Sequence, residues 1–498
     1  MRVYYAPYVS NYAYTYPASV APVASVQPVS APWVNNLKEM FHKRQAVTYA
    51  LLIRTFAAED KNHNGKIEPQ LGENGTFLKA IKLLPQLKAL GVNNLHILPI
   101  TPSGVIGKPG EPDSPGSAYA PAAYDRVSEE LAEPGVNLSV VQQARMFVDA
   151  CHQLGIHVML DVPSCASIDL TMKRPDLMSQ DAQGHLLSPG EWRDIRMFVN
   201  DSPELRQFYQ KFFDMAVNQL NVDGFRVDVA RARTRAFWQH FIGQYPDKAW
   251  LAESYTSEDA SPMKNMARDI PEDLSKVGFD AIYGQFHIFS DINANQFEQY
   301  LRQNEAMLKR VGPEKSIIAS YETHDDPSAM EHGGVLYCKL VAAMMCVTPN
   351  TTPYILDGFT TGYTQPFDVF NWRPKPQGIH PEIGQFLKRM LAIRQSAQYG
   401  PVLTMGHYVP LPVEQDQKDP NVIAYIRKFQ NKTVLILANK DVNAIHDATI
   451  EIPGLKAQQK LVNLAPTYGQ RSMFKLYPGE LEVKLAPGRF YMFDLNLQ

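Results

Sequence analysis

Residues 203–228 read PELRQFYQKFFDMAVNQLNVDGFRVD, and this stretch predicts one helix followed by one strand. Pro203 after Ser202 suits the first turn of a helix, which the apolar spacing extends to Leu220. The apolar run Gly224–Asp228 that follows indicates a buried strand. A helix and a strand that alternate in this way form the repeating unit of a parallel sheet.

The same alternation continues on both sides of this unit. Eight β-rich apolar runs occur between residues 47 and 356, and helical patterns separate them. Eight such units predict a parallel sheet closed into a (β/α)8 barrel, with its active groups at the carboxyl ends of the strands. The expected strands are Val47–Phe56, Asn94–Ile100, Ile156–Val162, Gly224–Asp228, Ala249–Ala252, Phe279–Tyr283, Ser316–Tyr321 and Thr352–Leu356. The expected helices include Phe77–Leu90, Val140–Leu154, Pro203–Leu220, Gln296–Val311 and Leu336–Cys346.

The pattern changes after Tyr399–Pro401, where Gly and Pro mark a boundary. Short alternating runs with turn residues between them predict a small all-β sandwich. We therefore expect a catalytic barrel over residues 37–398 and a β-sandwich domain over residues 399–498. The expected strands of the sandwich are Val422–Arg427, Thr433–Asn439, Ala448–Ile452, Leu481–Leu485 and Phe490–Leu495.

Residues 1–36 differ from the rest of the chain. They contain six tyrosines, five prolines and a single charged residue, Arg2. This composition predicts a flexible tail, and the alternative is an aromatic arm that docks on a partner or on a glycan. Prolines interrupt every apolar stretch of the tail, so we recognise no signal-peptide core and expect a cytoplasmic protein.

The composition excludes several classes of protein. The 498 residues are 45% hydrophobic and 20% charged, with a net charge of −3, which argues against a nucleic-acid binder. Four cysteines exclude a disulfide scaffold, and no apolar run is long enough to predict a membrane span. No Walker loop, dinucleotide fingerprint or zinc-binding His-Glu-x-x-His motif occurs, so we expect no organic cofactor.

The predicted strand Gly224–Asp228 ends in two charged residues. Side chains two residues apart on a strand share a face, so Arg226 and Asp228 should both point into the barrel mouth. A buried carboxylate needs a partner, and the arginine favours its ionised form, which suits a nucleophile. The alternative is a core ion pair that only holds the barrel together.

Other predicted strands also end in acids. Glu253 follows an apolar strand and lies near another carboxylate, so its pKa should be raised and it should stay protonated, as a general acid requires. His324 and Asp325 end a further strand, where they could contact sugar hydroxyls and stabilise positive charge. Asp161 is a fourth carboxylate at a strand end. The alternatives are a glutamate at a helix start for Glu253 and a turn cap for the residues 321–327.

These acids follow the third, fourth, fifth and seventh predicted strands, so they should meet at one mouth. Two carboxylates about 5–5.5 Å apart are typical of a retaining glycosidase. A third carboxylate would stabilise the oxocarbenium-like transition state.

The segments that carry these acids resemble, in this order, the four short motifs of the α-amylase family, glycoside hydrolase family 13. The resemblance covers about residues 40–498 and implies a reduced domain B after the third strand, at about residues 164–194. It also implies that Asp228 is the nucleophile, Glu253 the acid/base and Asp325 the transition-state stabiliser. The resemblance further implies four substrate-binding residues: Arg226, which would also orient Asp228, His324, Tyr119 and Asp161.

The chain departs from the family pattern at two places. Cys165-Ala166 stands where the first motif usually has Asn-His, a pair that contacts the sugar and a structural calcium. Arg231-Ala232 stands where the second motif commonly has Lys-His, which changes the acceptor side of the site. Substrate specificity therefore does not follow from the resemblance.

Residues 60–68, DKNHNGKIE, form a separate candidate metal loop. Oxygen-bearing residues at alternate positions, with a glycine for the turn, resemble the start of an EF-hand loop. The alternative is a polar Asn-Gly turn. The expected ligands of a structural Ca²⁺ are the side chains of Asp60, Asn62, Asn64 and Glu68 and the carbonyl of Lys66.

The residues and the resemblance together predict a retaining α-glycosidase that acts on α-glucan or a related α-linked oligo- or polysaccharide. A transglycosylase or a phosphorylase-type transferase of the same family is the first alternative. A catalytically inactive, amylase-like protein that binds glycan or a partner is the second.

Overall fold

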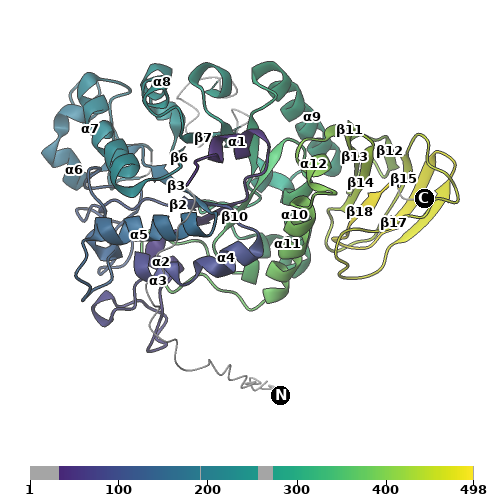
Figure 1. Cartoon of the computed structure of the whole chain (residues 1–498), viewed down its shortest axis with the longest axis horizontal. Helices are drawn as coiled ribbons and strands as arrows, with labels where there is room; N and C mark the ends of the chain where they lie inside the picture. Colours follow the sequence, from purple (N-terminus) through teal and green to yellow (C-terminus); the bar gives the residue numbers. More distant parts are fainter. Residues whose placement is uncertain (1–32, 191, 256–272, 497–498) are drawn as a thin grey trace. The chain divides into compact units, whose positions relative to one another are not determined.

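The computed structural model describes residues 33–190, 192–255 and 273–496 (Figure 1). The tail expected over residues 1–36 lies almost entirely outside these described residues. The elements below all belong to one compact unit, Asn35–Gln498.

Eight parallel strands close into a barrel, which confirms the predicted fold class. Around the barrel the strands follow the order β1-β10-β9-β8-β7-β6-β3-β2. Parallel pairing brings their carboxyl ends to one mouth, with Asp161 of β3 directly opposite Arg226 of β6. The barrel strands are β1 (Thr48–Leu51), β2 (Asn94–Ile97), β3 (His157–Val162), β6 (Gly224–Val227), β7 (Ala249–Tyr255), β8 (Ala281–Tyr283), β9 (Ser316–Ala319) and β10 (Thr351–Leu356).

Helices connect these strands and surround the barrel (Figure 1). The helix expected over Phe77–Leu90 is split in two, because Pro85 near the start of the second half cannot donate to the preceding turn. The helix expected over Pro203–Leu220 continues from an α-helix into a π-helical segment, η4 (Met215–Leu220). The α-helices are α1 (Leu37–His42), α2 (Ile53–Phe56), α3 (Phe77–Ile81), α4 (Leu84–Leu90), α5 (Val140–Gln153), α6 (Ile168–Lys173), α7 (Pro203–Asp214), α8 (Arg235–Gln244), α9 (Ala294–Val311), α10 (Ala329–Val347), α11 (Pro381–Arg394) and α12 (Gly400–Thr404).

Polar side chains fix the starts of the helices, as the sequence signals indicate. The Ser202 hydroxyl accepts a hydrogen bond from the amide of Leu205, with Pro203 in the first turn of α7. Ser139 and Gln142 form a reciprocal capping box at the start of α5. These caps determine where each helix leaves its loop.

A small insertion lies between β3 and α7. Its strands β4 (Cys165–Ser167) and β5 (Ile195–Met197) pair antiparallel, and α6 lies between them in the sequence. The strand β4 begins only three residues after β3 ends, so the insertion starts at the barrel mouth.

The C-terminal region forms two antiparallel four-stranded sheets. Their strand orders are β11-β13-β14-β18 and β12-β15-β17-β16. The sequence pattern did not predict β11, β12 and β16, which are short or have a weak apolar alternation. The strands are β11 (His407–Pro410), β12 (Val413–Gln415), β13 (Val422–Phe429), β14 (Lys432–Asn439), β15 (His446–Glu451), β16 (Met473–Tyr477), β17 (Glu480–Leu485) and β18 (Phe490–Asp494).

One described helix, α10, is long and apolar enough to cross a membrane by length and composition alone. Its backbone leaves helical geometry at Gly333 and Gly334. Of its most apolar 18-residue stretch, 56% is buried inside the protein. It packs against α11 and β10. We therefore treat α10 as a buried helix of the barrel wall.

Buried arginines hold the end of α10. Arg394 of α11 donates to the carbonyls of Cys346, Thr351, Leu403 and Arg44 at 2.6–3.2 Å. Arg427 of β13 donates to the carbonyl of Val347 at 2.8 Å, so a C-terminal strand also binds this helix end. Burial lowers the pKa of Arg394 to about 10. The guanidinium groups satisfy carbonyls that the helix end leaves unpaired and lie at the negative end of its dipole.

Replacing Arg394 by Met should lower the free energy of unfolding by about 3 kcal/mol, because buried carbonyls lose charged donors. The matched control is Arg389→Met, which changes an exposed arginine of the same helix and should cost under about 0.5 kcal/mol. Scanning calorimetry of both variants measures the difference. Equal melting temperatures for the two variants would show that the buried guanidinium does not stabilise the fold.

Candidate active site

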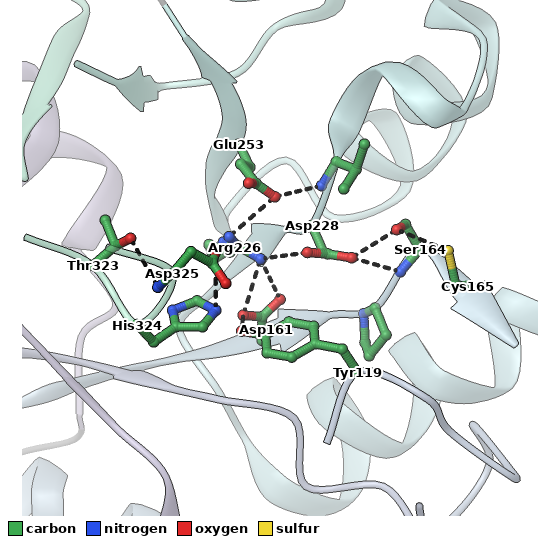
Figure 2. A network of polar contacts seen from close by, with 12 residues as sticks. Tyr119, Asp161, Ser164, Cys165, Arg226, Asp228, Glu253, Thr323, His324 and Asp325 are labelled. Atoms are coloured by element: carbon green, nitrogen blue, oxygen red, sulfur yellow. Dashed lines mark hydrogen bonds and ion pairs between the residues drawn. The ribbon is translucent and has the colours of Figure 1, made fainter. Parts of the chain in front are cut away.

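The carboxyl ends of four barrel strands bring the predicted acids together. Asp161 lies on β3, and Arg226 lies on β6 with Asp228 directly after it. Glu253 lies on β7, and the segment after β9 carries Asp325. Figure 2 shows these side chains meeting around one guanidinium group. The barrel topology therefore joins residues that are up to 164 positions apart in the sequence.

The Arg226 guanidinium organises the site. Its Nη1 lies 2.9 Å from Oδ1 of Asp228 and 3.1 Å from Oδ1 of Asp161, and its Nη2 lies 3.1 Å from Oε2 of Glu253. The side chain is 1% exposed and lies against the rings of Tyr119 and Tyr283. One buried cation thus contacts three carboxyl groups and holds Asp228 and Glu253 side by side.

The two carboxyl groups beside Arg226 have different environments. The pKa of Glu253 is raised to about 8, chiefly by burial and also by the charges of Asp228 and Asp325, and Arg226 and the Val229 amide oppose this rise. Burial also raises the pKa of Asp228, but Arg226 and a hydrogen bond from Ser164 oppose it. Glu253 therefore keeps its proton at neutral pH, whereas the contacts from Arg226 and Ser164 favour the ionised form of Asp228.

The backbone is strained immediately after Asp228. Val229 has φ 38° and ψ 58°, a left-handed conformation that is unusual for a β-branched residue. This conformation aims the Val229 amide at Oε2 of Glu253, to which it donates at 2.7 Å. The strained backbone thus holds the Val229 N–H group against the Glu253 carboxyl group.

His324, Asp325 and Tyr119 form the opposite wall. The rings of His324 and Tyr119 stack with centroids 5.1 Å apart, and Nε2 of His324 lies 3.5 Å from Oδ2 of Asp325. The Asp325 side chain is 62% exposed and projects into the mouth. A carboxylate held this way can face positive charge on a bound sugar.

Two residues expected to bind substrate are buried instead. Asp161 is 0% exposed in its side chain, and it accepts hydrogen bonds from Tyr119 Oη at 2.8 Å and from Arg226. Arg226 lies beneath the carboxylates that it pairs. Neither side chain lines the cleft, so both hold other site residues rather than the substrate. Asp161 and Arg226 are buried because each lies inside the barrel, one residue before the last residue of its strand.

Asp228, Glu253 and Asp325 line a cleft of about 530 Å³. Trp192 of the insertion is 49% exposed, and Phe370 of the loop after β10 is 37% exposed, at the rim of this cleft. The cleft also contains Arg231, close after the nucleophile strand. A concave site with aromatic groups and a few acids suits a sugar chain.

Sequence reasoning missed two residues of the site. Ser164 donates to Asp228, and His96 of β2 lies with Nε2 2.9 Å from Asp161 and Nδ1 2.9 Å from the Tyr354 hydroxyl. Burial lowers the pKa of His96, so the neutral ring donates through Nε2 to Asp161. The polar His96 inside an otherwise apolar strand was a signal that could have identified it.

Comparisons with known proteins agree with this geometry. No family model matches the chain. The maltogenic α-amylase of Bacillus acidopullulyticus is 22% identical, over 84% of this chain and 73% of that enzyme. The solved structure of a noncanonic maltogenic α-amylase from Thermotoga neapolitana has the same fold, with a TM-score of 0.72, 20% identity, and coverage of 92% of this chain and 100% of that one. In sequence and in fold the chain is similar to enzymes of the α-amylase family.

A second group of relatives in the α-amylase family are transferases. The α-1,4-glucan:maltose-1-phosphate maltosyltransferase of Chlorobaculum tepidum is 26% identical, over 47% of this chain and 37% of that enzyme. The chain therefore spans well under half the length of that transferase. Similarity to these enzymes does not by itself decide between hydrolysis and transfer.

The structure shows what replaces the Asn-His pair of the α-amylase family. Ala166 is completely buried and lies outside the cleft, whereas Cys165 lines the cleft. Ser164, just before them, contacts Asp228. The polar contact that this segment makes with Asp228 thus comes from the Ser164 hydroxyl.

The candidate metal loop, residues 60–68, contributes no residue to the lining of the catalytic cleft. Oε2 of Glu68 accepts from the side-chain amides of Asn62 and Asn64 at 2.7 and 3.0 Å. The Asp60 carboxylate accepts from the amides of Asn64 and Gly65. The side chains of the loop thus hydrogen-bond to one another and to its backbone, and their carboxylate and amide oxygens are of the type that Ca²⁺ takes as ligands.

Proposed function

We propose that this chain is a member of the α-amylase family and acts on α-glucosidic bonds as a retaining glycosidase, through a covalent glycosyl-enzyme intermediate. Its substrate class is α-glucan or a related α-linked oligosaccharide. The observation that carries the proposal is that one guanidinium holds Asp228 and Glu253 together, while the pKa of Glu253 is raised to about 8. An ionised and a protonated carboxyl side by side are the two groups that this reaction requires.

In the first step, Glu253 donates its proton to the glycosidic oxygen while Asp228 attacks the anomeric carbon. The bond to the leaving oxygen breaks, and an ester to Asp228 forms. Asp325 faces the positive charge that develops on the sugar ring. In the second step, Glu253 takes a proton from water, and the water oxygen displaces Asp228 with net retention of configuration.

The proposal is tested by incubating the protein with maltooligosaccharides and following the products by chromatography and proton NMR. We expect shorter oligosaccharides whose new reducing ends form first as the α-anomer. First-formed β-anomer would contradict the retaining mechanism. No turnover on maltooligosaccharides, sucrose or trehalose, with Asp228→Asn behaving like the wild type in glycan binding, would favour a binding protein.

Transfer to a second sugar or to phosphate is the second candidate function. It is supported by the similarity to maltosyltransferases and by Arg231, a cation in the cleft. The same incubation, with and without phosphate, distinguishes the outcomes. Longer oligosaccharides indicate transglycosylation, and sugar phosphates indicate phosphorolysis.

We also propose a structural Ca²⁺ on the loop of residues 60–68. Asp60, Asn62, Asn64 and Glu68 would hold it together with the carbonyl of Lys66. The ion would stabilise the loop after β1 and would take no part in the reaction.

Chelator should lower the melting temperature of the protein by a few degrees, since an ion at 100 times its Kd contributes about 2.7 kcal/mol to the folded state. Asp60→Asn should melt at the chelated temperature with or without Ca²⁺. Asp447→Asn, an exposed aspartate of β15, is the control and should keep the response to chelator. A wild-type melting temperature that chelator leaves unchanged would count against the ion.

A further inference from the structure

The two oxygens of the Asp228 carboxylate have different partners. Oδ1 accepts one hydrogen bond, from Nη1 of Arg226 at 2.9 Å. Oδ2 accepts two, from the Ser164 hydroxyl at 2.6 Å and from the Ser164 amide at 3.1 Å. Ser164 is 3% exposed and follows β3 directly after Pro163, so its position is fixed by the barrel (Figure 2).

Each carboxylate oxygen has two lone pairs in the plane of the group. Within the described residues, both lone pairs of Oδ2 face a donor, whereas Oδ1 has one that no donor occupies. An attacking oxygen needs a lone pair that is free to form the bond to carbon. We propose that Ser164 is a positioning residue that holds Oδ2 as the non-attacking oxygen, so that Oδ1 bonds to the anomeric carbon. This assignment rests on the proposed function.

Cys165 supports the orientation of Ser164. Its Sγ lies 3.7 Å from the Ser164 hydroxyl oxygen. Burial raises the pKa of the Cys165 thiol to about 12, so the thiol keeps its proton. The Asp228 carboxylate can only accept, so the Ser164 proton goes to Oδ2 and the thiol donates to the Ser164 oxygen. The chain of donors therefore runs from Cys165 through Ser164 to Asp228.

Ser164 should affect the two chemical steps unequally. In the first step, an electron pair of Oδ1 forms the bond to the anomeric carbon, and the leaving oxygen takes the Glu253 proton. In the second, the water oxygen bonds to the anomeric carbon and the water gives a proton to Glu253, while the bond between Oδ1 and the anomeric carbon breaks and its electron pair returns to Asp228. A carboxylate oxygen accepts hydrogen bonds more strongly than an ester carbonyl. The two Ser164 donors therefore favour release of Asp228 in the second step.

The test uses Ser164→Ala with 4-nitrophenyl α-maltoside, whose good leaving group makes the second step limiting. We expect kcat to fall about tenfold through the loss of one hydrogen bond to a charged group, and KM to fall by a similar factor. The glycosyl-enzyme should accumulate, seen as a burst of 4-nitrophenolate and as a maltosyl adduct in the intact-protein mass. Ser164→Thr keeps a hydroxyl and should recover most of kcat.

Ser316→Ala is the matched control, because it removes a hydroxyl of a buried barrel serine that has no partner within the described chain and lies at the opposite end of the strands. It should keep the wild-type burst. A Ser164→Ala variant with wild-type kcat and no added adduct, while the wild type turns over, would overturn this assignment alone. A wild type that shows neither turnover nor adduct would overturn the proposed function together with it.

Discussion

Asp228→Asn should lower kcat on maltooligosaccharides by about 10⁵-fold, the order of loss seen when a covalent nucleophile is removed. The amide has the shape of the carboxylate but cannot form the ester, and it loses the charge that Arg226 neutralises. Steady-state kinetics with product chromatography measures the loss. Asp357→Asn is the control, because Asp357 is a buried aspartate directly after β10 that bonds to Tyr49 and lies outside the cleft.

The configuration of the product that an added nucleophile forms gives a second test of Asp228. In Asp228→Ala, added azide can occupy the vacated space and attack the anomeric carbon directly. We expect the inverted β-glycosyl azide from an α-aryl glycoside. A loss of activity under tenfold, or an azide product of retained configuration, would be inconsistent with Asp228 as the nucleophile.

Glu253→Gln should lower kcat/KM on maltooligosaccharides by about 10²–10⁴-fold, the usual contribution of a general acid. With an aryl glycoside as substrate, the rate of the first step should fall much less, because a phenolate can leave without being protonated. The wild type should also lose activity as the pH rises through about 8, since Glu253 acts as an acid only while it is protonated. This alkaline limb should be absent from the variant.

Glu322→Gln is the matched control for this change. Glu322 is also a buried glutamate at the end of a barrel strand, and burial raises its pKa to about 7, but it accepts from the Ala329 amide at the start of α10. The control should keep both the dependence on leaving group and the alkaline limb. Loss of the limb in Glu322→Gln, with its retention in Glu253→Gln, would reassign the acid.

The barrel and its ring of acids could be predicted from the sequence because both depend on local patterns. Apolar runs of strand length alternate with helical segments, and parallel closure then places every strand end at one mouth. Acids directly after such runs, such as Asp228 and Glu253, must therefore meet. The sequence pattern does not distinguish exposed acids from buried ones, and Asp161, an expected substrate contact, is instead buried in an ion pair with Arg226.

The remaining parts of the site depend on contacts between distant segments. His96 meets Asp161 and Tyr354, which are 65 and 258 residues away, and a single histidine within a strand does not reveal either partner. The contact of Ser164 with Asp228 depends on the turn at Pro163, which no periodic pattern describes. The left-handed conformation of Val229 contradicts its residue preference and can be found only in coordinates.

The most direct test of the account is to find the residue that carries the sugar. A 5-fluoro α-glycosyl fluoride slows the second step, so the glycosyl-enzyme can be digested and its labelled peptide sequenced by mass spectrometry. We predict a single adduct on the carboxylate of Asp228. An adduct on Glu253 or Asp325, or turnover with inverted products and no adduct, would contradict the central claim.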